Sequence, residues 1–168
     1  MTSDLDKNGF YSPTNGSVTF RKIVEQIAEF VDSDSKSLYS VIIGSDSQIK
    51  HSKTGAECDF VTAIVVHRHG YGARYFWKRE TIKKAPVLRD RIYEETARSL
   101  SAAAIIVPVI RERIEKDKYN FEIHVDVGPN GKTREMIKEL VGMVNGMGYN
   151  AKTKPYSWGA SSVADKHT

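Results

Sequence analysis

The chain has 168 residues, of which 40% are hydrophobic and 27% are charged, a composition typical of a single globular domain. Its one cysteine, Cys58, excludes an internal disulfide and a cysteine-rich zinc site, and it is typical of the reducing cytoplasm, where we expect the protein to act. The formal net charge of +4 favours a polyanionic partner, and no apolar run is long enough to span a membrane.

The first half of the chain predicts one helix followed by three strands. Residues 1–16 carry turn-forming pairs and should be an irregular lead-in to a single domain over residues 17–168. Apolar residues at helical spacing predict a helix from Ser17 or Thr19 to about Val31. We expect strands at about 38–45, 60–66 and 74–77, with a loop over 47–57 and a hairpin connection before the third strand. This connection holds His67 and His69, which we expect to be exposed to solvent.

The second half alternates helices and strands. A long helix begins after Pro86 and extends past Ile106, with Pro108 expected to kink or end it. Four elements complete the chain, namely a strand at 120–127, a helix at about 132–147, a short strand at 151–154 and a helix at about 159–167. The sequence therefore predicts an α/β fold with an extra N-terminal helix, three antiparallel strands and then alternating helices and strands.

Aspartates end two of the predicted strands. The apolar run from Val41 leads into Asp46, and the strand from Phe121 leads into Asp126. A carboxylate in this position lies at the rim of a sheet, where open α/β sheets bind their ligands. The repeated design predicts an acidic metal-binding site.

Two helical acids can join the aspartates. On the long helix, Glu95 shares a face with Ile92 and Ser99, and this phase favours it over the neighbouring Glu94. On the last helix, Asp165 lies on a face of small residues. An acid on the inner face of a helix is costly unless it is paired or binds a metal ion.

Any one of these acids, taken alone, is more simply explained as a helix cap or a surface group. The four together point to a hard divalent cation, Mg²⁺ or Mn²⁺, since these ions prefer oxygen ligands. Two such ions held close together can activate a water molecule and stabilise the leaving oxygen in phosphodiester cleavage.

Four segments of the chain resemble those of the YkuK-type bacterial family of predicted ribonuclease H-like proteins. The segments are Gly44-Ser45-Asp46-Ser47-Gln48, Leu88-Arg89-Asp90-Arg91-Ile92-Tyr93-Glu94-Glu95-Thr96, Ile123-His124-Val125-Asp126-Val127-Gly128 and Val163-Ala164-Asp165-Lys166. The resemblance implies a ribonuclease H-like fold with a five-stranded mixed sheet flanked by helices. It also implies that Asp46, Glu95, Asp126 and Asp165 bind two divalent ions.

The expected function is a metal-dependent nuclease that acts on RNA, DNA or a hybrid of the two. The alternative is a non-catalytic nucleic-acid-binding module with the same fold. Three lysines are candidate phosphate contacts, namely Lys132, Lys152 and Lys154. The Gly-Lys-Thr at 131–133 is similar to a nucleoside-triphosphate loop, but Asp126 stands where that pattern needs its first glycine.

Overall fold

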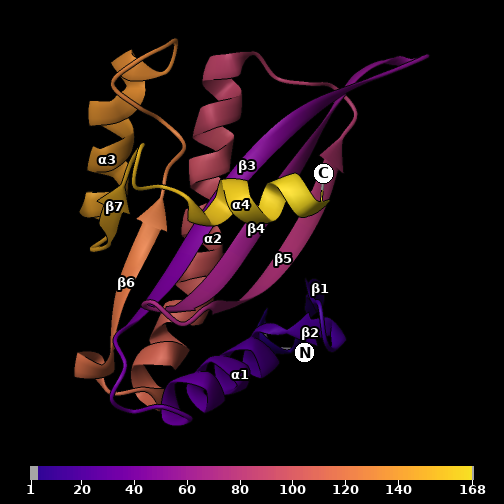
Figure 1. The fold of residues 1–168 in the computed structure, drawn as a ribbon. Helices are drawn as coiled ribbons and strands as arrows, with labels where there is room; N and C mark the ends of the chain where they lie inside the picture. The colour runs from indigo at the N-terminus through magenta and orange to yellow at the C-terminus, as the bar shows by residue number, and fades with distance from the viewer. Residues whose placement is uncertain (1–3, 168) are drawn as a thin grey trace.

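The computed structural model describes residues 4–167, apart from the side chains of Asn8, Ala160, Ala164 and Asp165. Over this range one mixed sheet of seven strands has helices on both faces (Figure 1). The strands are β1 (Asn8–Ser12), β2 (Gly16–Thr19), β3 (Tyr39–Ser52), β4 (Gly55–Arg68), β5 (Ala73–Ile82), β6 (Tyr119–His124) and β7 (Asn150–Lys152). The helices are α1 (Phe20–Asp32), α2 (Leu88–Arg113), α3 (Ile137–Gly146) and α4 (Gly159–His167), with short 3₁₀ turns η1 (Asp4–Asp6), η2 (Lys116–Lys118) and η3 (Arg134–Met136).

The sheet has the order β2-β1-β5-β4-β3-β6-β7, so the expectation of five strands is corrected to seven. Five of them follow the predicted pattern, because β3, β4 and β5 are antiparallel while β6 and β7 run parallel to β3. The two additional strands come mainly from the segment expected to be irregular. Strand β1 pairs with β5 at Tyr11 and Trp77, and β2 pairs with β1. A short edge hairpin contains few apolar residues, so its sequence has the appearance of a loop.

Strands β3 and β4 form one long hairpin that extends beyond the rest of the sheet. They pair from Tyr39–Arg68 to Ser52–Gly55, so residues 47–57, expected to be a loop, are mostly strand. On the other side of β3, pairing with β6 ends at Gly44 and His124. Beyond Gly44, no strand among the described residues covers this edge of β3.

Alternate residues of β3 face opposite sides of the sheet. Val41 and Ile43 belong to the larger core, which includes residues of α1 and α2. Ile42 belongs to a smaller core with Val163 of α4, and we call this side the α4 face. Figure 1 shows α4 crossing one side of β3 and β4 while α2 lies behind them.

Helix α2 continues through Pro108 to Arg113, so of the two expected effects of the proline, a kink or an end of the helix, the end does not occur. The burial of Ile106, Val107 and Ile110 on one side of the helix accounts for this, because packing outweighs the loss of one backbone hydrogen bond. Despite the length of α2, no helix in residues 4–167 is apolar and long enough to cross a membrane.

Gly159 lets α4 approach the sheet closely. A Cβ atom at this position would lie 2.8 Å from Cγ2 of Ile42 and 3.2 Å from Nδ1 of His124. The Gly159 N–H also donates a hydrogen bond of 3.0 Å to that Nδ1. The helix is therefore positioned by a contact that only glycine permits.

We predict that Gly159→Ala lowers the free energy of unfolding by about 1–3 kcal/mol in urea denaturation, because the methyl group must displace Ile42 or His124. Gly142→Ala in α3 is the matched control, since an added Cβ there meets no atom within 4 Å. It should be neutral or stabilising by up to about 1 kcal/mol. A Gly159→Ala protein as stable as the wild type would contradict the close approach.

Candidate functional site

Glu95 has a buried carboxyl group on the inner side of α2, next to the part of β3 that lies just beyond the end of its pairing with β6. It is 4% exposed, and its Oε1 accepts a hydrogen bond from the hydroxyl of Ser47. Burial is the main cause that raises the pKa of Glu95 to about 8. The hydrogen bond from Ser47 lowers the pKa of Glu95 and so opposes this rise. The negative charges of Asp46 and Asp126 raise the pKa further, whereas the positive charge of Arg91 lowers it. Glu95 is therefore mostly protonated at neutral pH.

Hydroxyl groups hold α2 against the sheet below Glu95. Ser99 Oγ donates to Ser45 Oγ at 2.9 Å, and the hydroxyls of Ser45 and Thr62 lie 3.0 Å apart. All three residues are buried, so these hydrogen bonds satisfy polar groups that water cannot reach. Their short side chains also let the helix lie close to β3, which places Glu95 at the strand.

Asp46 and Ser47 direct their side chains to opposite sides of β3. Strand alternation puts Asp46 on the α4 face and Ser47 on the side of α2. The half-buried Asp46 accepts a hydrogen bond of 2.9 Å at Oδ1 from the backbone N–H of Ser47. Because β6 no longer covers β3 here, carboxylates from both faces can meet at the open edge of the strand.

Asp126 follows the end of β6, in a tight turn in which the N–H of Val127 donates to the carbonyl of Val125 at 2.9 Å. Its Oδ1 lies 3.2 Å from Nζ of Lys154. Gly128 makes room for this lysine, because a Cβ at Gly128 would lie 3.0 Å from Cβ of Lys154. An ion pair therefore occupies one oxygen of Asp126.

The structure brings three of the four candidate acids into one region, since the charges of Asp46 and Asp126 both act on Glu95. Asp165 lies on α4, and its side chain is outside the described part of the chain. Glu94 is directed elsewhere and pairs with Nε of Arg98 at 2.9 Å. The helical phase of α2 therefore places Glu95, and not Glu94, beside the aspartates.

The three candidate lysines lie in different surroundings. Lys154 pairs with Asp126, as described above. Lys152, two residues earlier, lines a cavity on the α4 face. Lys132 is exposed on the loop between β6 and η3. Of the three lysines, Lys154 is the one that pairs with a candidate acid among the side chains that the structure describes.

Two residues near the acids had no place in the site expected from the sequence. Ser47 hydrogen-bonds Glu95, and Arg91 lies one helical turn before Glu95, with Nε buried and without a hydrogen-bond partner among the described residues. The sequence could have indicated Arg91, because it lies four residues before Glu95 and residues four apart share a face of a helix.

The donor set is chemically suited to a hard divalent cation, because it offers several carboxylate oxygens. The described side chains nevertheless contain no group of three or more His, Cys, Asp or Glu placed to hold an ion. The space lined by Glu95, Asp126 and His124 leaves no volume for a water molecule. A cation between Glu95 and Asp126 would occupy this space, and a cation at Oδ1 of Asp126 would replace Lys154, whose side chain is 55% exposed.

Comparisons with known proteins agree with this arrangement of strands and helices. A family model described as ribonuclease H-like matches residues 22–168. The uncharacterized protein YkuK of Bacillus subtilis (strain 168) is 34% identical over 173 residues, which cover 95% of this chain and 96% of the relative. No solved structure matches the chain.

The raised pKa of Glu95 predicts a pH-dependent stability of the metal-free protein. The folded state holds a proton on Glu95 up to about pH 8, whereas the unfolded chain releases it near its ordinary pKa of 4.5. This stabilisation is complete below the unfolded pKa and is lost as pH rises toward the folded pKa, by about 1 kcal/mol per pH unit. Glu95→Gln removes the titrating group. The free energy of unfolding of this variant minus that of the wild type should therefore increase between about pH 5 and pH 8 and then level off.

Urea denaturation in the presence of a chelator measures this difference. Glu112→Gln is the matched control, because Glu112 is an exposed glutamate on the same helix. Its stability difference from the wild type should not change with pH. A flat difference for Glu95→Gln as well would show that Glu95 titrates normally.

Proposed function

Because the chain belongs to the YkuK-type ribonuclease H-like family, we propose that it is a divalent-metal-dependent nuclease that hydrolyses phosphodiester bonds of nucleic acid. One observation carries the proposal, namely that Asp126 and the buried Glu95 line one space at the open edge of β3, where Ser47, the residue after Asp46, hydrogen-bonds Glu95. Carboxylates gathered in this way repel one another when ionised, and a cation offsets that repulsion. The edge is also the place where a long polymer can approach the sheet.

In this proposal Asp46, Glu95, Asp126 and Asp165 would hold Mg²⁺ or Mn²⁺. When bound, the ions would supply an activated water and stabilise the departing oxygen of the phosphodiester. Ser47 holds the Glu95 carboxylate at the end of β3. Lys154, once it leaves Asp126, offers its ammonium group to a phosphate oxygen of the substrate.

A non-catalytic nucleic-acid-binding module is the second candidate. The Lys154–Asp126 ion pair favours it, because the lysine already neutralises one of the carboxylates that a metal ion would use. In that case the acidic residues would have a structural role, and the net charge of +4 would serve to attract the nucleic acid. Both candidates fit the cytoplasmic location that the single cysteine leads us to propose.

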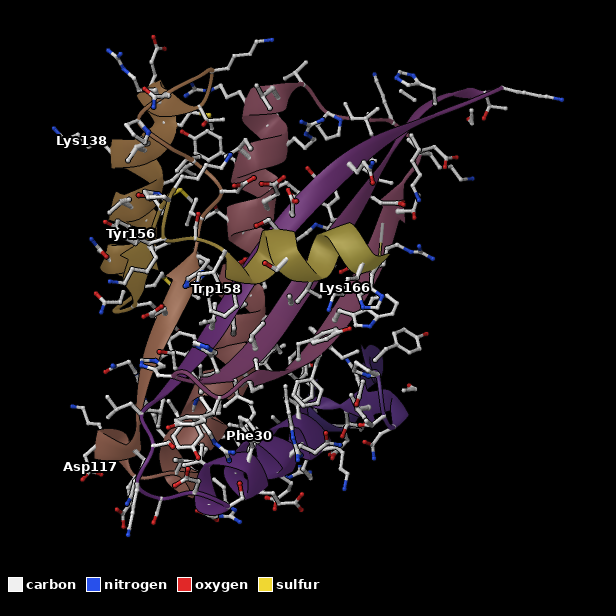
Figure 2. All side chains as sticks on the ribbon, in the orientation of Figure 1. Phe30, Asp117, Lys138, Tyr156, Trp158 and Lys166 are labelled. Atoms are coloured by element: carbon white, nitrogen blue, oxygen red, sulfur yellow. The ribbon has the colours of Figure 1, made fainter. Side chains whose placement is uncertain are left out.

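We predict that the wild type cleaves at least one of single-stranded RNA, DNA and an RNA–DNA hybrid with Mg²⁺ or Mn²⁺. Asp46→Asn should reduce the rate by about 100-fold or more, because it removes a proposed metal ligand while preserving shape. Gel analysis of labelled oligonucleotides measures the rate. Asp117→Asn is the matched control, since Asp117 is exposed at the other end of the sheet (Figure 2) and should leave the rate unchanged.

The results separate the two candidates. If neither ion supports cleavage of any of the three substrates, the enzyme proposal fails and the binding module remains. If Asp46→Asn cleaves as fast as the wild type, the activity belongs to other residues.

Lys154 should compete with a cation for Asp126. We therefore predict that Lys154→Met binds Mn²⁺ about two- to fivefold more tightly than the wild type, the range expected from removing a half-exposed ion pair. Isothermal titration calorimetry measures the affinity without any substrate. Lys138→Met, which removes an exposed lysine of α3 (Figure 2), should not change it. A weaker affinity in Lys154→Met would contradict the competition.

A further inference from the structure

A cavity of about 350 Å³ lies on the α4 face of the sheet and has no role in the function proposed above. Side chains from β3, β4, β6 and β7 line it, together with the segment that leads into α4. The lining residues that carry the argument are His67, His69, Glu122, Lys152, Tyr156 and Trp158. Its volume is at the lower end of the range of small-molecule sites, which suits a planar ring system with few substituents.

The cavity adjoins the carboxylate site. Glu122 precedes Asp126 by four residues, which is at most about 13 Å of extended chain. Lys152 precedes Lys154 by two residues, or about 7 Å. His124 contributes to both places, because its Nε2 is 2.9 Å from Glu122 Oε1 and the residue is also part of the lining of the space beside Asp126. One bound strand can therefore reach both places.

Aromatic rings form one side of the cavity. Figure 2 shows Tyr156 near β7 and Trp158 just before α4, and these side chains are 70% and 39% exposed. The Trp158 ring contacts His67 and His124, with centroids 5.1 Å and 5.7 Å away. Large aromatic side chains left partly in water gain contact area when a flat ring stacks on them.

One of the two histidines of this region is less exposed than the sequence analysis expects. His67 is half-buried in β4, whereas His69 is exposed, as expected, and its Nε2 lies 2.7 Å from the Ser40 hydroxyl. Burial, and then the charge of His69, lowers the pKa of His67. A neutral imidazole beside Trp158 adds to a surface suited to an uncharged ring.

Polar groups of both kinds border the aromatic surface. Glu122 offers carboxylate oxygens as hydrogen-bond acceptors, and Lys152 offers an ammonium donor. The edge of a nucleobase carries both donors and acceptors, so it can use both residues. A purely apolar ligand would use neither Lys152 nor the Glu122 oxygen that does not contact His124.

We propose that this cavity binds a nucleobase of the strand whose phosphodiester bond lies at the carboxylate site. The placement of the strand rests on the proposed function, but base binding itself depends only on the cavity. The enzyme would then hold one base while it acts on a neighbouring bond, and so would favour unpaired nucleotides, whose bases are free to enter.

Nucleosides test the proposal directly, because they carry a base and no phosphate. In a Trp77→Phe background, Trp158 is the only tryptophan, and its fluorescence reports on the cavity. We expect adenosine or uridine, added without any divalent metal, to change this fluorescence saturably with a dissociation constant of about 1 mM. Free N-acetyltryptophanamide, titrated in parallel, corrects for collisional quenching.

Tyr156→Ala in the same background should weaken nucleoside binding about fivefold or more, the loss expected from one base-stacking contact. Tyr71→Ala is the matched control, because Tyr71 is 76% exposed on the turn between β4 and β5 and should not alter binding. The inference is overturned if neither nucleoside binds saturably, or if Tyr156→Ala binds as tightly as Tyr71→Ala.

These outcomes are independent of cleavage. Nucleoside binding without cleavage of any nucleic acid would support the cavity and remove the nuclease proposal. Cleavage without nucleoside binding would keep the nuclease and remove the base-binding cavity.

Discussion

The end of the β3–β6 pairing at Gly44 and His124 is the constraint on which the rest of the site depends. Up to that point β3 is enclosed by neighbouring strands, and its side chains pack on both faces. Beyond it, β3 continues toward Ser52 with one edge uncovered by any described strand. Side chains from opposite faces can meet around this edge, so Asp46 of the α4 face can act on Glu95, which Ser47 hydrogen-bonds on the α2 side. A seventh pair of residues beyond His124 would separate these groups.

Electrostatic balance is the second requirement of the site. Three carboxylates lie in one region, and the structure limits their repulsion in two ways. Burial favours the protonated form of Glu95, and Lys154 neutralises part of the charge of Asp126. The half-buried Arg91 adds a further positive charge near Glu95. The same residues thus stabilise the fold without a cation and determine what a cation must displace.

The sequence could predict those features that depend on local periodicity. The 3.6-residue period of α2 distinguishes Glu95 from Glu94, and apolar runs followed by aspartate locate Asp46 and Asp126. The β1–β2 hairpin and the outer half of the β3–β4 hairpin escaped prediction because exposed strands carry polar residues that are typical of loops. The pairing of Lys154 with Asp126 and the cavity beside it depend on how distant segments cross. Gly128 and Gly159 allow these crossings, but a glycine alone does not indicate what it lets approach.

The uncovered edge of β3 also has a consequence for self-association. A long strand edge that no neighbouring strand covers is a template onto which a second molecule can add a strand, the usual route to edge-to-edge aggregation. The outer part of β3 carries Lys50 and His51, and Lys53 follows in the turn, all three exposed. Lys50 pairs with Asp59 across the hairpin at 2.6 Å, which holds its ammonium group on this part of the strand. Lysines on an exposed strand disfavour intermolecular pairing, because pairing would remove their charged groups from water, so the strand edge can stay open for a ligand.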